Sequence, residues 1–164
     1  MRMAWLLPLL AGLLLTPAAA QAPGTRGAVV GQPAPELGVK DLQGRTWRLK
    51  DLKADRTYVL YFWATWCSAC REVTPLLKDL YEKRGSDNWE WVTISLDDDM
   101  AALRRYVRAN PGSHLQLVDP EGELAARWRT RFVPTVIVLR NGKVLARESG
   151  KLTRPQLQRL TQLK

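Results

Sequence analysis

Residues 57–70 read TYVLYFWATWCSAC and contain both cysteines of the 164-residue chain, Cys67 and Cys70. The apolar run over 57–63 is typical of a strand that is buried on both faces. A helical pattern follows the second cysteine, and two residues three apart on the first turn of a helix lie on one face. Their sulfur atoms can therefore meet in a disulfide. A C-x-x-C pair between a strand and a helix predicts a thiol–disulfide redox site.

The position of the first cysteine predicts which thiol is the nucleophile. Cys67 is expected just outside the helix, next to backbone N–H groups that have no partner within the helix. Those donors and the helix dipole stabilise a thiolate, and such surroundings can lower a thiol pKa from ~8.5 into the range ~3.5–7.5. We therefore expect Cys67 to attack first and Cys70 to resolve the mixed disulfide.

Three other interpretations of the cysteine pair remain open at this stage. Half of a zinc site would need two more ligands, and His114 is the only other good candidate. A purely structural disulfide that closes so short a loop stabilises a fold weakly. Binding of Cu(I) by two soft thiolates is the third alternative, although no Met or His cluster accompanies them.

The N-terminus has the pattern of an export signal. Arg2 precedes an apolar run from Ala4 to Leu15, and Ala18–Ala20 offers a cleavage site. The run is shorter than the ~20 residues that a membrane span needs. We therefore expect a cleaved signal peptide over residues 1–20 and a periplasmic location, with an uncleaved membrane anchor as the alternative.

The remainder of the chain is expected to form one domain. Residues 21–34 are rich in Gly, Ala and Pro and predict a flexible lead-in to a domain over 35–164. Export would place the two cysteines in an oxidising compartment, where a dithiol stays reduced only with a dedicated electron source. The formal net charge of +9 favours acidic partners. No nucleic-acid-binding motif is present, so we expect no nucleic-acid partner, and we expect a monomer.

Strands and helices alternate along this domain, which predicts an α/β sandwich around a mixed sheet. The Asn141-Gly142 pair is typical of a hairpin turn, and Thr153 with Gln156 forms a capping box for a last helix that runs to Leu163. We expect strands over 37–42, 46–49, 57–63, 89–96, 115–118, 135–139 and 143–148, and earlier helices over 69–83, 100–109 and 121–128.

Three segments resemble the thioredoxin superfamily: FWATWCSAC over 62–70, FVPT over 132–135 and NGKV over 141–144. Within it, the chain resembles the exported TlpA/ResA-type proteins, with supporting matches over 31–35, 41–44 and 118–122. The likeness spans about residues 30–164. It implies a thioredoxin-like fold: a central mixed sheet flanked by helices, an N-terminal hairpin and an inserted helix–strand unit.

The resemblance also implies roles for residues near the cysteines. It implies that Val133–Pro134 is a cis peptide beside the Cys67–Cys70 disulfide, with the Val133 backbone offering an edge to an extended substrate. Trp66 is then an apolar platform next to Cys67. The implied activity is reduction of disulfides in exported proteins, among them candidates in cytochrome c maturation. A membrane protein would supply the electrons, and no cofactor or metal is implied. A disulfide-donating oxidant is the alternative.

Two positions depart from the family pattern. Thioredoxin has a buried Asp six residues before its first cysteine, and this chain has Tyr61 there. The TlpA/ResA group often has a Glu three residues after its second cysteine. This chain has Val73 there and Glu72 one position earlier. Because one residue turns a helix by ~100°, we expect Glu72 to point to solvent. Water and Glu72 are the remaining candidates for the general base of Cys70, and water is favoured.

Four further residues or groups have simpler explanations. We expect a surface or loop role for His114, and a helix start for the acidic run over 97–99. Trp63 is expected in the core. Arg71 follows Cys70 directly, and its charge either favours a nearby thiolate or is simply solvated.

Overall fold

The computed structural model describes residues 27–84 and 88–163, and the expected signal peptide over 1–20 lies outside them. Seven strands form one mixed sheet in the order β2-β1-β5-β4-β3-β6-β7. The strands are β1 (Val39–Asp41), β2 (Thr46–Trp47), β3 (Thr57–Trp63), β4 (Trp89–Ser95), β5 (Leu115–Val118), β6 (Thr135–Arg140) and β7 (Lys143–Ser149). The helices are α1 (Ser68–Glu82), α2 (Met100–Ala109), α3 (Glu123–Arg127) and α4 (Arg154–Thr161), with a 3-10 turn η1 (Leu49–Asp51).

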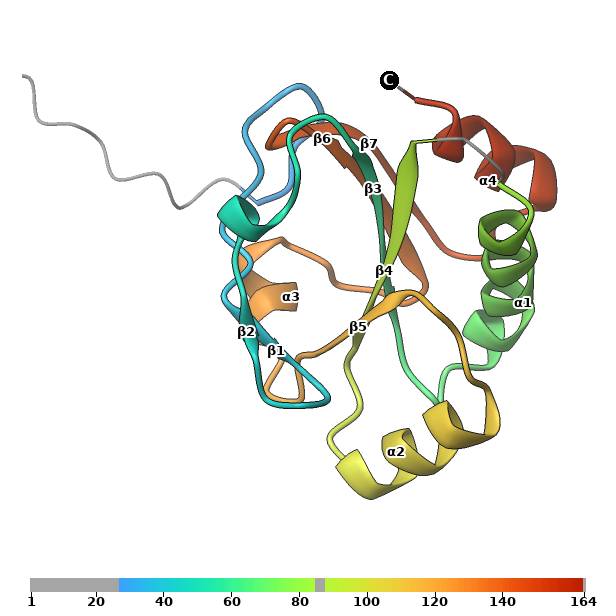
Figure 1. The fold of residues 1–164 in the computed structure, drawn as a ribbon. Helices are drawn as coiled ribbons and strands as arrows, with labels where there is room; N and C mark the ends of the chain where they lie inside the picture. Colours follow the sequence, from blue (N-terminus) through green and yellow to red (C-terminus); the bar gives the residue numbers. More distant parts are fainter. Residues whose placement is uncertain (1–26, 85–87, 164) are drawn as a thin grey trace, which may run out of the picture.

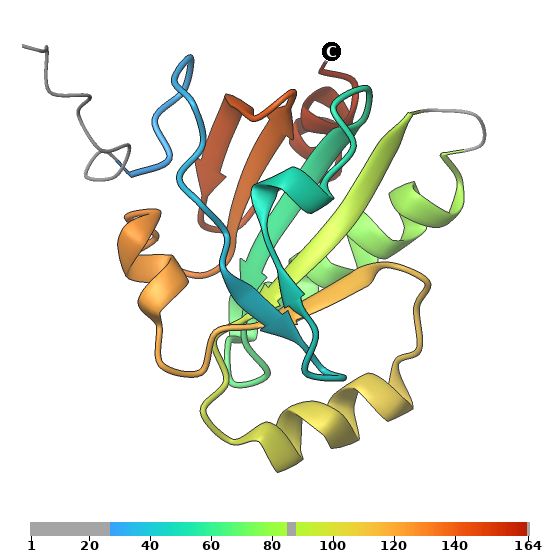
Figure 2. The same ribbon diagram turned by 60° about the vertical axis from the view of Figure 1, so that its left-hand side comes forward.

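The sheet combines a parallel centre with antiparallel edges. Strands β3, β4 and β5 run parallel, β6 and β7 continue antiparallel on one side, and β1 pairs antiparallel with β5 on the other. Helices α1 and α4 cover one face of the sheet and α3 covers the other (Figure 1). Helix α2 lies beyond one end of the sheet, near the start of α1 (Figure 2). The N-terminal hairpin β1–β2 and the inserted unit α2–β5 confirm the expected thioredoxin-like layout.

Strand β3 forms the centre of the core, and all seven of its residues are buried. Because side chains alternate along a strand, Tyr61 and Trp63 pack on the side of α1 and α4, while Leu60 and Phe62 pack on the side of α3. Full burial of an apolar side chain contributes about 1.5–3 kcal/mol. The continuous apolar run was therefore correctly interpreted as a strand with both faces covered. Its C-terminal end delivers the chain directly to Cys67.

Most expected elements differ from the structure by one or two residues at an end, and two of these differences have a clear local cause. Leu49 belongs to η1 rather than to the second strand, because its backbone N–H donates to the Glu36 carboxylate. The helix expected over 121–128 begins at Glu123. The residue before it, Gly122, has a φ of 70° in the left-handed region, which ends the preceding turn.

The expected flexible lead-in over 21–34 also differs from the structure in its second half. The backbone N–H of Gly31 donates to the Val144 carbonyl, and that of Ala34 donates to the Gly142 carbonyl. Pro33 forms a bridge with Lys143 at the edge strand β7. From Gly31 onward the segment is therefore held against the β6–β7 hairpin, and the Ala28 N–H donates to the Trp128 carbonyl. Residues 21–26 lie outside the described part.

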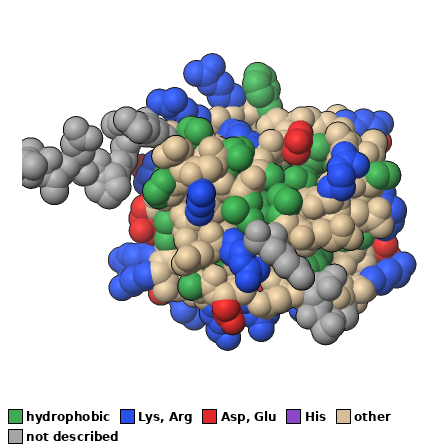
Figure 3. All heavy atoms as spheres, turned by 90° about the horizontal axis from the view of Figure 1, so that it is seen from above, with side chains coloured by type: hydrophobic (Ala, Val, Ile, Leu, Met, Phe, Trp, Pro, Cys, Tyr) green, Lys and Arg blue, Asp and Glu red, His purple; other side chains and the backbone are tan. Residues whose placement is uncertain are grey.

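The surface agrees with the basic composition. The end of the molecule remote from the first turn of α1 carries Lys and Arg side chains around most of its outline (Figure 3). Within residues 27–84 and 88–163, no helix combines the length and the apolar character that a membrane crossing requires.

Candidate active site

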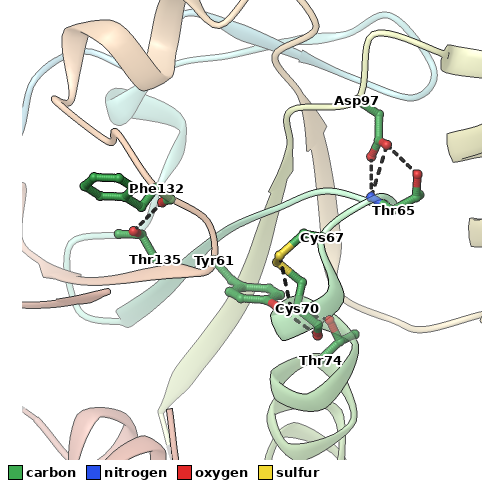
Figure 4. Close-up of a disulfide and its surroundings, with 8 residues drawn as sticks. All are labelled: Tyr61, Thr65, Cys67, Cys70, Thr74, Asp97, Phe132 and Thr135. Carbon is green, nitrogen blue, oxygen red and sulfur yellow. Dashed lines mark hydrogen bonds between the residues drawn. A yellow bond between two sulfur atoms is a disulfide. The ribbon is translucent and has the colours of Figure 1, made fainter. Parts of the chain in front are cut away.

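The two cysteines meet at the start of α1. Cys67 is the N-cap residue of the helix and Cys70 lies in its first turn. They are joined by a disulfide, and their Cα atoms are 5.2 Å apart. The backbone N–H of Cys70 donates to the Cys67 sulfur at 3.1 Å. Figure 4 shows this arrangement at the first turn of the helix. The structure therefore confirms that Cys67 lies just outside the helix, where its sulfur accepts a hydrogen bond from the backbone N–H of Cys70.

The two cysteines differ slightly in exposure, and only Cys67 lies at the N-terminal end of the helix, where a thiolate is stabilised. Cys67 is 6% exposed and Cys70 is 1% exposed. No acidic residue lies in the first turn of α1, so nothing there offsets the positive end of the helix dipole. After reduction, a negative charge on Cys67 would be stabilised by this helix end. Cys70, one turn inside the helix, lacks that position.

Tyr61 stands behind Cys70, where thioredoxin has its buried Asp. The Tyr61 hydroxyl donates to the Cys70 carbonyl at 3.3 Å and shares a hydrogen bond with the Thr74 hydroxyl at 3.2 Å. Burial raises the pKa of Tyr61 well above its usual value, so the phenol stays protonated. The contact fixes the first turn of α1, and a protonated phenol at this position is no general base.

The Glu72 side chain points to solvent. Its side chain is 57% exposed, and its carboxylate pairs with Lys151 at 2.6 Å. Val73, at the position of the family's Glu, is buried. The expectation that Glu72 points to solvent is thus confirmed.

The loop before β6 lies beside the disulfide. The Val133–Pro134 peptide is cis, as the resemblance implied. Val133 packs against the core cluster that contains Cys67 and Cys70. The Thr135 hydroxyl donates to the Phe132 carbonyl at 2.7 Å and bonds to the Ser149 hydroxyl at 2.8 Å. These contacts fix the backbone of the loop beside the redox pair.

Two aromatic side chains stand out from this region into solvent. Trp66 is 63% exposed and Phe132 is 72% exposed. Trp66 directly precedes Cys67, and its exposure matches the expected apolar platform. Phe132 was not singled out from the sequence, because exposure of a side chain two residues before a proline has no pattern of its own.

The comparisons with known proteins agree with this geometry. A family model described as thioredoxin-like matches residues 55–144, which contain both cysteines and Pro134. This chain belongs to the thioredoxin-like family. A thioredoxin-like protein of Haemophilus influenzae is 32% identical over 120 residues, which are 73% of this chain and 70% of that protein.

Two further relatives carry names from thiol–disulfide chemistry. The thiol–disulfide oxidoreductase ResA of Bacillus thuringiensis subsp. konkukian is 29% identical over 130 residues, covering 79% of this chain and 75% of that protein. A Chlorobium tepidum structure, described as a candidate thiol:disulfide interchange protein DsbE, superimposes with a TM-score of 0.73 at 25% identity. It covers 82% of this chain and 96% of that one. This thioredoxin-like protein is a thiol–disulfide oxidoreductase.

A buried carboxylate that the sequence interpretation missed supports the loop before Cys67. Asp97 of the thioredoxin-like protein is 2% exposed. It accepts hydrogen bonds from the Thr65 backbone N–H at 3.0 Å, from the Thr65 hydroxyl at 2.5 Å and from the Ser95 hydroxyl at 2.6 Å. Figure 4 shows the carboxylate above the turn that leads into α1. Asp97 is therefore a positioning residue for the segment that ends at Cys67.

The acidic run over 97–99 divides into two functions. Asp99 is the N-cap of α2, where it accepts from the backbone N–H groups of Ala101 and Ala102, which confirms the expected helix start. Asp97 faces the other way, toward Thr65. The signal that could have found it is topological: parallel strands end at one edge of a sheet, so residues just after β3 and β4 meet there.

His114 lies away from any group of metal ligands. It occupies the loop before β5, as expected, but its ring is partly buried and stacks on Trp91 with a centroid distance of 3.9 Å. Burial lowers the pKa of His114 to about 4, so the ring is neutral at pH 7. Among the described residues, no three His, Cys, Asp or Glu side chains form a group that could hold a metal ion.

Proposed function

We propose that this thioredoxin-like protein reduces disulfide bonds of exported proteins, with Cys67 as the nucleophile and Cys70 as the resolving thiol. The observation that carries the proposal is the place of Cys67 at the N-cap of α1, where its sulfur accepts the Cys70 backbone N–H. The relatives named as thiol–disulfide oxidoreductases support it.

The proposed reaction transfers two electrons to the substrate. The Cys67 thiolate attacks one sulfur of a substrate disulfide, forms a mixed disulfide and releases the other substrate sulfur as a thiolate. Cys70 then loses its proton to water and attacks the Cys67 sulfur. This step releases the second substrate sulfur and forms the Cys67–Cys70 disulfide seen in the structure. The protein ends oxidised and the substrate ends as a dithiol.

The substrate would approach over the loop before β6. The Val133 backbone makes no hydrogen bond to another described residue, so it can pair with an extended segment as in strand addition. Pro134 lacks an N–H and leaves that edge open beside the sulfurs. Trp66 and Phe132 would contact apolar side chains of the substrate on either side, because both are exposed next to the cysteine pair.

Continued turnover requires an electron donor outside this chain. Both cysteines are consumed in the disulfide, and no other cysteine exists to reduce it. If the N-terminal pattern is an export signal, the donor must act in an oxidising compartment. We therefore propose a membrane protein that passes a dithiol's electrons to Cys67–Cys70. We also propose that the exported substrates include cytochrome c maturation components.

The reduction potential separates a reductase from an oxidant. We expect a value nearer thioredoxin's ~−270 mV than the ~−120 mV of a strong oxidant. A strong oxidant owes its potential to extra stabilisation of the reduced thiolate, and the intervening residues Ser68 and Ala69 offer no charged or imidazole group for that purpose.

The potential is measured by equilibrating the purified protein with glutathione buffers and quantifying the Cys67–Cys70 disulfide by mass spectrometry. A variant with Ser68→Pro and Ala69→His serves as a control that should shift toward the oxidising end of the scale, because a cationic ring would then lie beside the thiolate. A parent value above about −170 mV would favour the disulfide-donating alternative.

A further inference from the structure

A cavity lies between α1, α2 and the sheet. The cis-proline loop lies on the opposite side of the N-terminal end of α1. The volume of the cavity is about 220 Å³. It is lined by residues from the end of β3, from both helices and from β4 and β5, with His114 at the loop between α2 and β5. Sites for drug-sized ligands measure about 300–1,000 Å³. This cavity therefore suits a ligand of one ring or a short branched chain.

Its walls are aromatic. The rings of Trp63 and Tyr106 lie 5.1 Å apart, and those of Trp91 and His114 are stacked at 3.9 Å. All four side chains line the cavity. Flat apolar surfaces of this kind favour a flat ligand, because ring stacking adds to the burial of apolar area.

Two of these rings also carry a buried polar atom that has no hydrogen-bond partner in the part of the chain that the structure describes. The indole Nε1 atoms of Trp63 and Trp91 are buried and make no hydrogen bond within the described residues. Such groups are rare in folded proteins, because an unpaired buried donor costs about 1–3 kcal/mol. Burial raises the pKa of Tyr106, so its hydroxyl is also a donor at neutral pH. The lining also contains hydroxyl and amide groups that can both donate and accept, from Thr74, Thr93, Asn110 and Gln116.

The charged side chains that line the cavity are both positive. Arg71 and Lys78 of α1 border the cavity, and no Asp or Glu among the described residues does. Arg71 makes no hydrogen bond or ion pair with a described residue. Lys78 donates to the Pro111 carbonyl at 3.0 Å, and its ammonium lies 3.8 Å from the Glu82 carboxylate. A ligand with a negative group would meet the Arg71 guanidinium directly and would compete with Glu82 for Lys78, whereas a cationic ligand would meet no carboxylate in the described lining.

We propose that this cavity binds a small aromatic carboxylate, with its ring between the aromatic walls and its carboxylate at Arg71 and Lys78. The proposal goes beyond disulfide exchange and does not depend on it, because no lining residue is a cysteine. A carboxylate would pair with the Arg71 guanidinium, which makes no hydrogen bond or ion pair with a described residue. A neutral ring would fill the space without meeting either cation.

Benzoate is the probe, and the oxidised full-length protein is observed through its indole N–H signals by ¹⁵N NMR. We expect saturable shifts of the Trp63 and Trp91 signals, assigned with single Trp→Phe variants, at micromolar to millimolar benzoate. The Trp66 signal should stay in place, because Trp66 is exposed beside the disulfide and does not line the cavity. Benzamide and benzylamine are the neutral and cationic controls and should bind at least about tenfold more weakly.

The charge contribution is tested with Arg71→Gln/Lys78→Gln, which should weaken benzoate binding about tenfold while the rest of the spectrum shows a folded protein. The matched control is Lys83→Gln/Arg84→Gln, which removes two cations at the other end of α1. Absence of saturable shifts, equal binding of benzamide, or shifts centred on Trp66 would each overturn the proposal. None of these outcomes bears on whether Cys67 and Cys70 exchange disulfides.

Discussion

Replacement of Cys67 by serine should lower the rate of disulfide reduction at least about a thousandfold, which is the largest effect that we expect from any single substitution. Exchange requires a thiolate, and a serine hydroxyl is not ionised at neutral pH. The measurement is the rate at which the prereduced protein reduces the disulfides of a protein substrate such as insulin, followed by quantifying substrate thiols.

The partner variant Cys70→Ser distinguishes the two sulfurs. It retains the nucleophile but cannot resolve the mixed disulfide, so it should accumulate a covalent adduct with the substrate that survives denaturation and disappears on addition of dithiothreitol. Cys67→Ser should form no such adduct. If Cys67→Ser accumulated the adduct and Cys70→Ser did not, the proposed order of attack would be reversed.

Replacement of Asp97 by alanine should lower the free energy of unfolding by about 3 kcal/mol. The carboxylate accepts hydrogen bonds from the Thr65 backbone, the Thr65 hydroxyl and the Ser95 hydroxyl, and all three donors would lose their acceptor. Ser95 is itself buried, so water cannot replace the lost acceptor easily. Urea denaturation of the oxidised protein, compared with the parent at constant slope, measures the loss.

The neighbouring Asp98→Ala is a matched control, because Asp98 is exposed and bonds only to the next backbone N–H. It should change stability by less than about 0.5 kcal/mol. Asp97→Asn should fall between the two, since an amide oxygen can still accept from Thr65. Equal, small effects of Asp97→Ala and Asp98→Ala would show that the carboxylate does not hold the turn before Cys67.

The sequence predicted the parts of the site that depend on local pattern. The continuous apolar run over 57–63 indicated a strand with both faces buried, and the spacing of Cys67 and Cys70 indicated a helix start that brings the sulfurs together. Both signals lie within one segment, so neither depends on how distant parts of the chain pack. The fold itself followed from adding the family resemblance to the order of strands and helices.

The parts that the sequence did not predict depend on contacts across the fold. Asp97 meets Thr65 only because β3 and β4 lie parallel with Trp63 opposite Ser95. His114 stacks on Trp91, a contact set by the course of the chain from α2 into β5. The cavity beside them has no sequence signature, because its lining comes from five separate elements and a loop.

The central claim is that the N-terminus of α1 activates Cys67 and not Cys70. The direct measurement is the rate of alkylation of each cysteine in the reduced protein, taken from pH 4 to pH 10 and resolved by mass spectrometry. We expect Cys67 to react faster than Cys70 at neutral pH and to titrate below the ~8.5 of a free thiol. Faster labelling of Cys70, or a Cys67 pKa at or above that of a free thiol, would contradict the account.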